Sequence, residues 1–171
     1  MRYSKSKLLA ALLLISLALP CEASQVLQGR VLQVKDGDTV VIAPNAGGQF
    51  FVCRLYGIDA PEIAHGSKPA QRYGDEAMRV LKHLILGQTV EVDLTGSRTY
   101  NREVCIIRKD GMNINLEMVN RGYAWAYKQY LRRPYASEYI DAETEARSKR
   151  LGLWQDMNPT PPWEFRKAMR Q

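Results

Sequence analysis

The sequence predicts an α+β fold that is mainly β: a five-stranded barrel with one helix between strands three and four and two C-terminal helices. Three observations predict it. Five short runs rich in β-branched residues alternate with the period of two that is typical of strands. Segments with helical periodicity follow the third and the fifth of these runs. The length of 171 residues suits one compact domain, and this order of elements is that of an OB-type barrel.

The strands are expected to begin the chain as a meander. The predicted strands are residues 26–35, 39–43, 49–56, 89–94 and 103–108. A run of turn-forming residues, 44–48, ends the second strand, and Lys109-Asp110-Gly111 closes the fifth. The first three strands would therefore pair in sequence before the first helix begins.

Glycines mark the expected ends of the helices. The predicted helices are residues 75–86, 113–121 and 137–151. Gly87 is expected to stop the first helix as its C′ residue, and Gly122 and Gly152 are expected to stop the second and third. Ser137 is the candidate N-cap of the third helix.

Three segments are expected along the chain. Residues 1–23 read as a secretory signal, because a basic start and a short apolar run precede a predicted cut after Ala23. The alternative is a short membrane anchor, although a spanning helix needs about 20 apolar residues. Residues 24–154 would form the folded domain. Residues 155–171 are a proline-rich tail, expected not to be helical and to pack on the body through Trp163 and Phe165 rather than to stay flexible.

Composition sets the class of partner. Hydrophobic residues make up 46% and charged residues 25% of the chain, which is typical of a globular protein and not of a disordered or collagenous one. The formal net charge is +6, which favours a polyanionic partner such as nucleic acid. The signal predicts an exported protein, periplasmic or secreted, without membrane attachment after cleavage. We expect a monomer.

Carboxylates and arginines come together in three loop segments. Taken singly, residues 36–39, 54–62 and 98–102 read as ordinary turns and loops. Taken together, Asp38, Asp59 and Glu62 supply hard oxygen ligands, which suit Ca²⁺ or Mg²⁺ better than Zn²⁺. Arg54 and Arg102 supply planar guanidinium groups suited to phosphate oxygens. These groups would hold one cation beside one phosphate.

The same segments resemble the staphylococcal nuclease (thermonuclease) family, over roughly residues 31–154. The resemblance rests on Asp36-Gly37-Asp38-Thr39-Val40, Arg54-Leu55, Asp59-Ala60-Pro61-Glu62, Tyr73-Gly74, Tyr100-Asn101-Arg102 and Gly152-Leu153-Trp154. It implies a calcium-dependent endonuclease that hydrolyses DNA and RNA, prefers single strands and leaves 3′-phosphate ends. The alternative is a non-catalytic nucleic-acid-binding barrel, which would not need these carboxylates and arginines.

The resemblance also implies a metal site. By position, Asp38 and Asp59 match the family's direct carboxylate ligands to calcium, and the backbone carbonyl of Ala60 matches a further ligand. Glu62 matches the glutamate proposed as general base. Ala60 replaces a threonine of the family's archetype, which removes a side-chain hydrogen bond but not a backbone ligand.

The substrate contacts follow by the same resemblance. Arg54 and Arg102 match the two arginines on the scissile phosphate, and Tyr100 matches a tyrosine near the nucleotide phosphate. Tyr127 and Tyr130 fit the nucleotide-stacking positions, with packing in the protein as the alternative. Asn101 stands where glycine is usual and tolerates a positive φ better than most residues.

Two cysteines, Cys53 and Cys105, remain after the predicted cleavage. Each lies an odd number of residues from one of the two arginines, so both are expected to face away from the site along their strands. Strands three and five are neighbours in an OB barrel, which makes a disulfide between them feasible. The alternative is a pair of buried free thiols.

Overall fold

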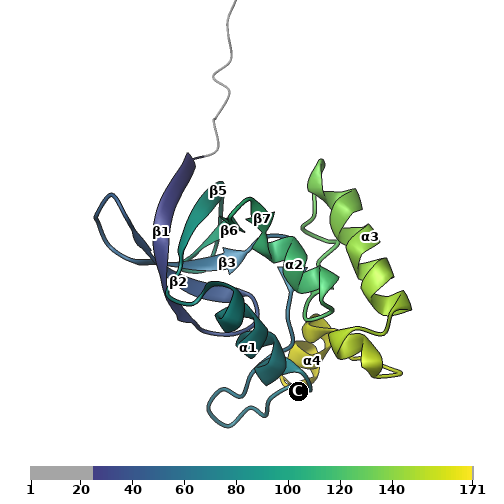
Figure 1. The fold of residues 1–171 in the computed structure, drawn as a ribbon. Helices are drawn as coiled ribbons and strands as arrows, with labels where there is room; N and C mark the ends of the chain where they lie inside the picture. The colour runs from purple at the N-terminus through teal and green to yellow at the C-terminus, as the bar shows by residue number, and fades with distance from the viewer. Residues whose placement is uncertain (1–24, 171) are drawn as a thin grey trace, which may run out of the picture.

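The computed structural model describes residues 25–170, which form a barrel with helices around one side (Figure 1). The strands are β1 (Gln25–Val34), β2 (Thr39–Pro44), β3 (Phe51–Leu55), β4 (Ile58–Asp59), β5 (Thr89–Thr99), β6 (Arg102–Lys109), β7 (Met112–Asn113) and β8 (Trp125–Ala126). The helices are α1 (Gly74–Ile85), α2 (Ile114–Asn120), α3 (Tyr135–Ser148) and α4 (Pro162–Ala168), and a 3₁₀ helix, η1, spans Gly152–Gln155. The predicted α+β class and the order of its main elements are confirmed.

The main sheet closes on itself. Its strand order is β3-β2-β1-β5-β6-β7, and a further pairing joins β3 to β6. The β3–β6 pairing is parallel and places Arg54 opposite Val104, while the antiparallel β2–β3 pairing places Arg54 opposite Thr39. This closure is that of an OB barrel. Arg54 therefore lies on a strand that has a hydrogen-bonded neighbour on each side.

The helix α1 fills one end of the barrel. Its side chains Ala77, Leu81 and Ile85 are fully buried and belong to the same core as the barrel residues Val40 and Ile107. The helix ends as predicted, because Gly87 follows it with a left-handed φ of 73°. This packing fixes α1 against the loops that precede it in the chain.

The helix α3 differs from its prediction at both ends. It begins at Tyr135, after Pro134, so Ser137 lies inside the helix and does not cap it. It ends at Ser148, and the left-handed residue just after its C-cap is Arg150, with a φ of 53°; Gly152, two residues further on, is also left-handed, with a φ of 51°.

Gly152 has a different structural role from the predicted helix stop. A Cβ atom at Gly152 would collide with the carbonyl oxygen of Gly122, so the two backbones can approach this closely only if the residue is glycine. The backbone N–H of Leu153 then donates to the carbonyl of Gly122 at 2.8 Å.

The expectation of a non-helical tail is wrong. The tail contains α4, and Pro162 is the first residue of that helix. Proline is favoured at this position, because its fixed φ suits the helix and the N–H it lacks would have no helical partner. The expected packing through Trp163 is found: its ring lies 5.5 Å from that of Trp125 and stacks on that of Tyr127 at 5.4 Å.

A disulfide joins Cys53 of β3 to Cys105 of β6, with Cα atoms 6.0 Å apart. Both cysteines are fully buried among the apolar side chains of the barrel core. The bond therefore links the two strands whose parallel pairing closes the barrel.

Loss of this disulfide should weaken the fold. Because it closes a loop between residues 52 apart in sequence, replacing both cysteines with alanine should lower the free energy of unfolding by roughly 2–4 kcal/mol. Urea denaturation with and without reductant measures the effect. Reductant should shift the wild-type midpoint and leave the double variant unchanged. An unshifted midpoint in wild-type protein shown to be reduced would contradict the expectation.

The predicted secretory signal, residues 1–23, lies outside the described residues. Within residues 25–170, none of the helices has the length and apolar character that crossing a membrane requires.

Candidate active site

The connection between β1 and β2 holds Asp38 in a fixed position. The Asp38 side chain is 2% exposed. Its Oδ2 accepts a hydrogen bond from the backbone N–H of Ala60 at 2.9 Å, and its Oδ1 accepts one from the Thr39 hydroxyl at 3.0 Å. A Cβ at Gly37 would lie 2.6 Å from that of Ala60. The loop can therefore pack this closely because residue 37 is a glycine.

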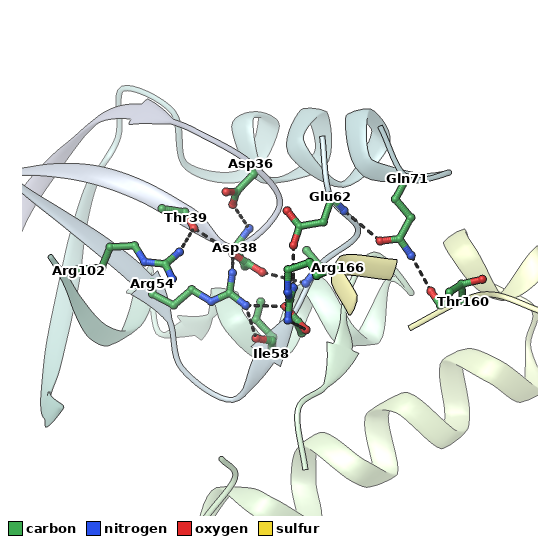
Figure 2. Close-up of polar contacts among 12 residues, drawn as sticks. Asp36, Asp38, Thr39, Arg54, Ile58, Glu62, Gln71, Arg102, Thr160 and Arg166 are labelled. Carbon is green, nitrogen blue, oxygen red and sulfur yellow. Dashed lines mark hydrogen bonds and ion pairs between the residues drawn. The ribbon is translucent and has the colours of Figure 1, made fainter. Parts of the chain in front are cut away.

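The guanidinium of Arg54 bridges two buried carboxylates. Its Nη1 donates to Oδ1 of Asp38, and its Nη2 donates to Oδ1 of Asp59 at 2.6 Å (Figure 2). The carbonyl of Ile58 accepts a further, longer bond at 3.5 Å. Asp59 is fully buried and lies on β4, which pairs with β8 through Trp125. Two separate pairs of strands thus bring the acidic groups to one arginine.

Glu62 follows β4 in a loop that the start of α1 holds in place. A Cβ at Gly74 would collide with the carbonyl oxygen of Glu62, so glycine is required where the helix begins. The side chain of Gln71 accepts a bond from the backbone N–H of Glu62 at 3.2 Å and donates to the carbonyl of Thr160 at 2.6 Å. Gln71 therefore connects the loop of Glu62 to the C-terminal segment.

Arg166 of α4 is a site residue that the sequence analysis missed. Its Nη1 donates to Oδ1 of Asp59 at 2.9 Å and to Oε1 of Glu62 at 2.7 Å. Its Nη2 donates to Oδ2 of Asp59 at 2.8 Å. Figure 2 shows the Arg166 side chain pointing toward that of Glu62. In the sequence Arg166 is one basic residue in a proline-rich tail, and no motif distinguishes it.

Arg102 reaches the same group of side chains from the start of β6. Its Nη1 lies 3.5 Å from the hydroxyl of Thr39, which in turn donates to Asp38. Tyr100, two residues earlier, is 89% exposed in the β5–β6 turn. The left-handed residue of this turn is Tyr100, with a φ of 55°, and not Asn101, which the sequence marks as tolerant of a positive φ. Primed hairpin turns need a positive φ at their first central residue, which here is Tyr100.

Tyr127 and Tyr130 lie after β8, close to α4. Their rings meet edge to face with centroids 4.8 Å apart, and the Tyr127 ring also stacks on Trp163. Tyr130 is 54% exposed. A cavity of about 340 Å³, lined in part by Trp125, Tyr127, Lys128 and Trp163, opens beside them. One face of Tyr127 is thus already covered by the protein.

The electrostatics of the site distinguish the buried carboxyl of Asp38 from the two arginines. Burial raises the pKa of Asp38 well above its usual value, Arg54 opposes this shift, and the carboxylates of Asp36 and Asp59 add to it. Burial lowers the pKa of Arg54, but Asp38 and Asp59 outweigh it, so that its pKa is raised. The pKa of Arg166 is raised in the same way. Burial lowers it, but the hydrogen bonds to Asp59 and Glu62 raise it by more. Both guanidinium groups therefore stay charged.

The donor chemistry of the carboxylate cluster, defined here as Asp38, Asp59 and Glu62, fits a hard divalent cation. Carboxylate oxygens are the ligands that Ca²⁺ prefers. Across residues 25–170, no three His, Cys, Asp or Glu side chains are arranged to hold a metal ion. Instead, Arg54 and Arg166 lie between the carboxylates and neutralise part of their charge.

The structure thus brings together the predicted residues Asp38, Arg54, Asp59, Glu62 and Arg102 in one continuous polar network (Figure 2). Ala60 takes part through its backbone N–H. Tyr100 lies out in solvent beyond Arg102.

Comparison with known proteins gives consistent matches. A family model described as "Staphylococcal nuclease homologue" matches residues 52–156, more than half of the chain. An "uncharacterized endonuclease" of Haemophilus influenzae is 36% identical over 160 residues, which cover 94% of this chain and 84% of that protein. A protein of the same description from Escherichia coli O157:H7 is 37% identical over 141 residues, covering 82% of this chain and 85% of that protein.

A "micrococcal nuclease" of Shigella flexneri is 33% identical over 170 residues, which cover 94% of this chain and 91% of that protein. The matched family segment contains Arg54, Asp59, Glu62 and Arg102, while Arg166 lies beyond it. The chain therefore belongs to the staphylococcal nuclease family and is a phosphodiester-hydrolysing nuclease.

Proposed function

We propose that this nuclease is a calcium-dependent endonuclease, exported from the cell as a monomer, that hydrolyses DNA and RNA and leaves 3′-phosphate ends. The observation that carries the proposal is Arg54, held between the buried carboxylates of Asp38 and Asp59. A phosphodiester is an anion, and its hydrolysis needs positive charge at the reacting oxygens together with a positioned water molecule. The polar network supplies the positive charge through its arginines and can position a water molecule through its carboxylates.

The two predicted arginines have the phosphate-binding role. Arg54 and Arg102 reach the network from β3 and β6, whose parallel pairing sets their relative position. Their planar groups can each donate to two phosphate oxygens, and these bonds strengthen as negative charge develops in the transition state. Asp38 and Asp59 would hold Ca²⁺ with the carbonyl of Ala60, and the bound ion would supply Lewis-acid charge.

Glu62 is assigned the role of general base. Its side chain is 32% exposed, so water can reach it, whereas Asp38 and Asp59 are buried. Its Oε1 accepts a bond from Arg166, and we assign the proton of the attacking water to Oε2. Its contact with Arg166 joins this carboxylate to the network of Asp59 and Arg54, which supports a position beside the expected phosphate.

The substrate strand is expected to pass over the exposed aromatic residues. Tyr100 and Tyr130 offer exposed rings on which bases can stack, and Tyr127 contributes the edge of its pair with Tyr130. Splayed bases suit such contacts, which favours single-stranded substrates.

Removal of divalent ions provides the test. With a calcium chelator, digestion of single-stranded DNA should fall to background, and added Ca²⁺ should restore it. The control is DNA binding in the chelator, measured at low salt, which should persist through the basic residues. Undiminished digestion in chelator would contradict calcium dependence. Binding without digestion at any Ca²⁺ concentration would instead indicate a non-catalytic barrel.

A further inference from the structure

Arg166 is a positive charge seated on the oxygens that the proposed calcium ion needs. It donates to both oxygens of Asp59 and to one oxygen of Glu62, at 2.7–2.9 Å. We propose that Arg166 is a resident counter-cation, which neutralises Asp59 and Glu62 in the metal-free enzyme and must give way when Ca²⁺ binds. This inference rests on the proposed calcium dependence and extends it to a residue outside the matched family segment.

The position of Arg166 is fixed by its surroundings. Trp163, three residues earlier on α4, stacks on Tyr127 at 5.4 Å and contacts Trp125 edge to face. The segment before α4 is tied down by the bond from Gln71 to the carbonyl of Thr160. Trp163 and Arg166 are neighbours on one face of the helix, because residues three apart lie side by side. Packing therefore directs the guanidinium toward the carboxylate cluster.

Arg166 and Ca²⁺ would compete for the same two carboxylate oxygens of Asp59. Its Oδ1 already accepts from both Arg54 and Arg166, and its Oδ2 accepts from Arg166. Asp59 is fully buried, so in this arrangement its charge is balanced by these arginines rather than by solvent. A divalent ion bound to Asp59 would stand beside Arg166, and like charges at this distance repel in a partly desolvated site. Calcium binding is therefore an exchange of one cation for another.

The exchange also links the metal to the general base. In the metal-free arrangement Arg166 holds Oε1 of Glu62 at 2.7 Å. Displacement of Arg166 from Asp59 removes two of its three bonds and loosens its hold on Glu62. Glu62 would then be free to turn toward the attacking water only in the calcium-loaded enzyme, although its Oε2 is not held by Arg166 in either state.

The test compares the calcium affinities of two charge-matched variants. Arg166→Gln removes the proposed competitor, whereas Lys167→Gln removes the same charge from the adjacent, exposed position. Coupling between two ligands typically changes affinity by roughly 5- to 150-fold, so we expect Arg166→Gln to bind Ca²⁺ about tenfold more tightly than wild type. Lys167→Gln should stay within about twofold, because exposed charges are screened. Isothermal titration calorimetry on the intact protein measures both.

Thermal denaturation supplies a second readout. In chelator, Arg166→Gln should melt below Lys167→Gln, and saturating Ca²⁺ should raise its melting temperature by more. If Arg166→Gln does not fold, Arg166→Lys carries the test, because lysine keeps the charge but cannot bridge the carboxylates with a planar fork. It should bind Ca²⁺ more tightly than wild type by a smaller factor.

The inference is overturned if the folded Arg166 variants bind Ca²⁺ no more tightly than Lys167→Gln. Should wild type bind Ca²⁺ and digest DNA in that case, the proposed function stands and only the role of Arg166 fails. Absence of Ca²⁺ binding by wild type and by every variant would overturn both.

Discussion

Replacement of Arg54 by alanine is expected to slow DNA hydrolysis by at least about a hundredfold, because it removes a charge-assisted contact that strengthens in the transition state. Initial rates on single-stranded DNA at saturating Ca²⁺ measure the effect. Arg54→Lys is the matched variant, since it keeps the charge and loses the planar fork. It should also be slow. Near-wild-type turnover of the alanine variant would remove Arg54 from the mechanism.

Arg54→Ala should also lower the free energy of unfolding. Arg54 joins Asp38, which is 2% exposed, to Asp59, which is fully buried. Removing one partner of a buried ion pair typically costs about 3–5 kcal/mol, and Arg166 reduces the loss at Asp59. Protonation removes the charge of a buried carboxylate that has lost its partner, and burial already raises the pKa of Asp38. A carboxyl with a raised pKa stabilises the fold when it is protonated. The loss of stability caused by Arg54→Ala should therefore grow as the pH rises through that pKa.

Glu62→Gln is expected to reduce hydrolysis by at least about a hundredfold, because an amide of the same shape cannot take up the proton of the attacking water. The fold should persist, since the side chain is 32% exposed and its loop is held through backbone contacts with Gln71. Initial rates across a pH range measure the change.

Glu164→Gln serves as the matched control for Glu62→Gln, since it removes a negative charge from an exposed position on α4. It should keep the wild-type rate. Equal rates for wild type and Glu62→Gln would show that another group activates the water.

The sequence predicted the elements whose signals are local. Alternation along the strands and the apolar face of α1 specify the barrel and its covering helix, and Gly87 marks the helix end. The three loop segments could be assigned to one site because each carries a type of group with a specific chemistry. The pairing that brings them together, β3 with β6, follows from the order of the strands.

The elements that the sequence did not predict depend on distant contacts or on position within a turn. The start of α4 was missed because proline was taken as a helix breaker, although Pro162 occupies the first turn. Arg166 meets Asp59 across a sequence separation of 107 residues, which no local pattern can reveal. Asn101 was singled out only as tolerant of a positive φ, whereas the left-handed residue of the β5–β6 turn is Tyr100.

The bond between Cys53 and Cys105 has a consequence for the chemistry as well as for the fold. Each cysteine shares a strand with one of the two arginines proposed to bind phosphate, so the covalent link holds Arg54 and Arg102 to a common frame. Thermal sliding of β3 past β6 would alter the spacing of their guanidinium groups, and the crosslink restrains that motion. Turnover by this nuclease would then respond to the thiol–disulfide balance of its surroundings, even at temperatures where the reduced protein stays folded.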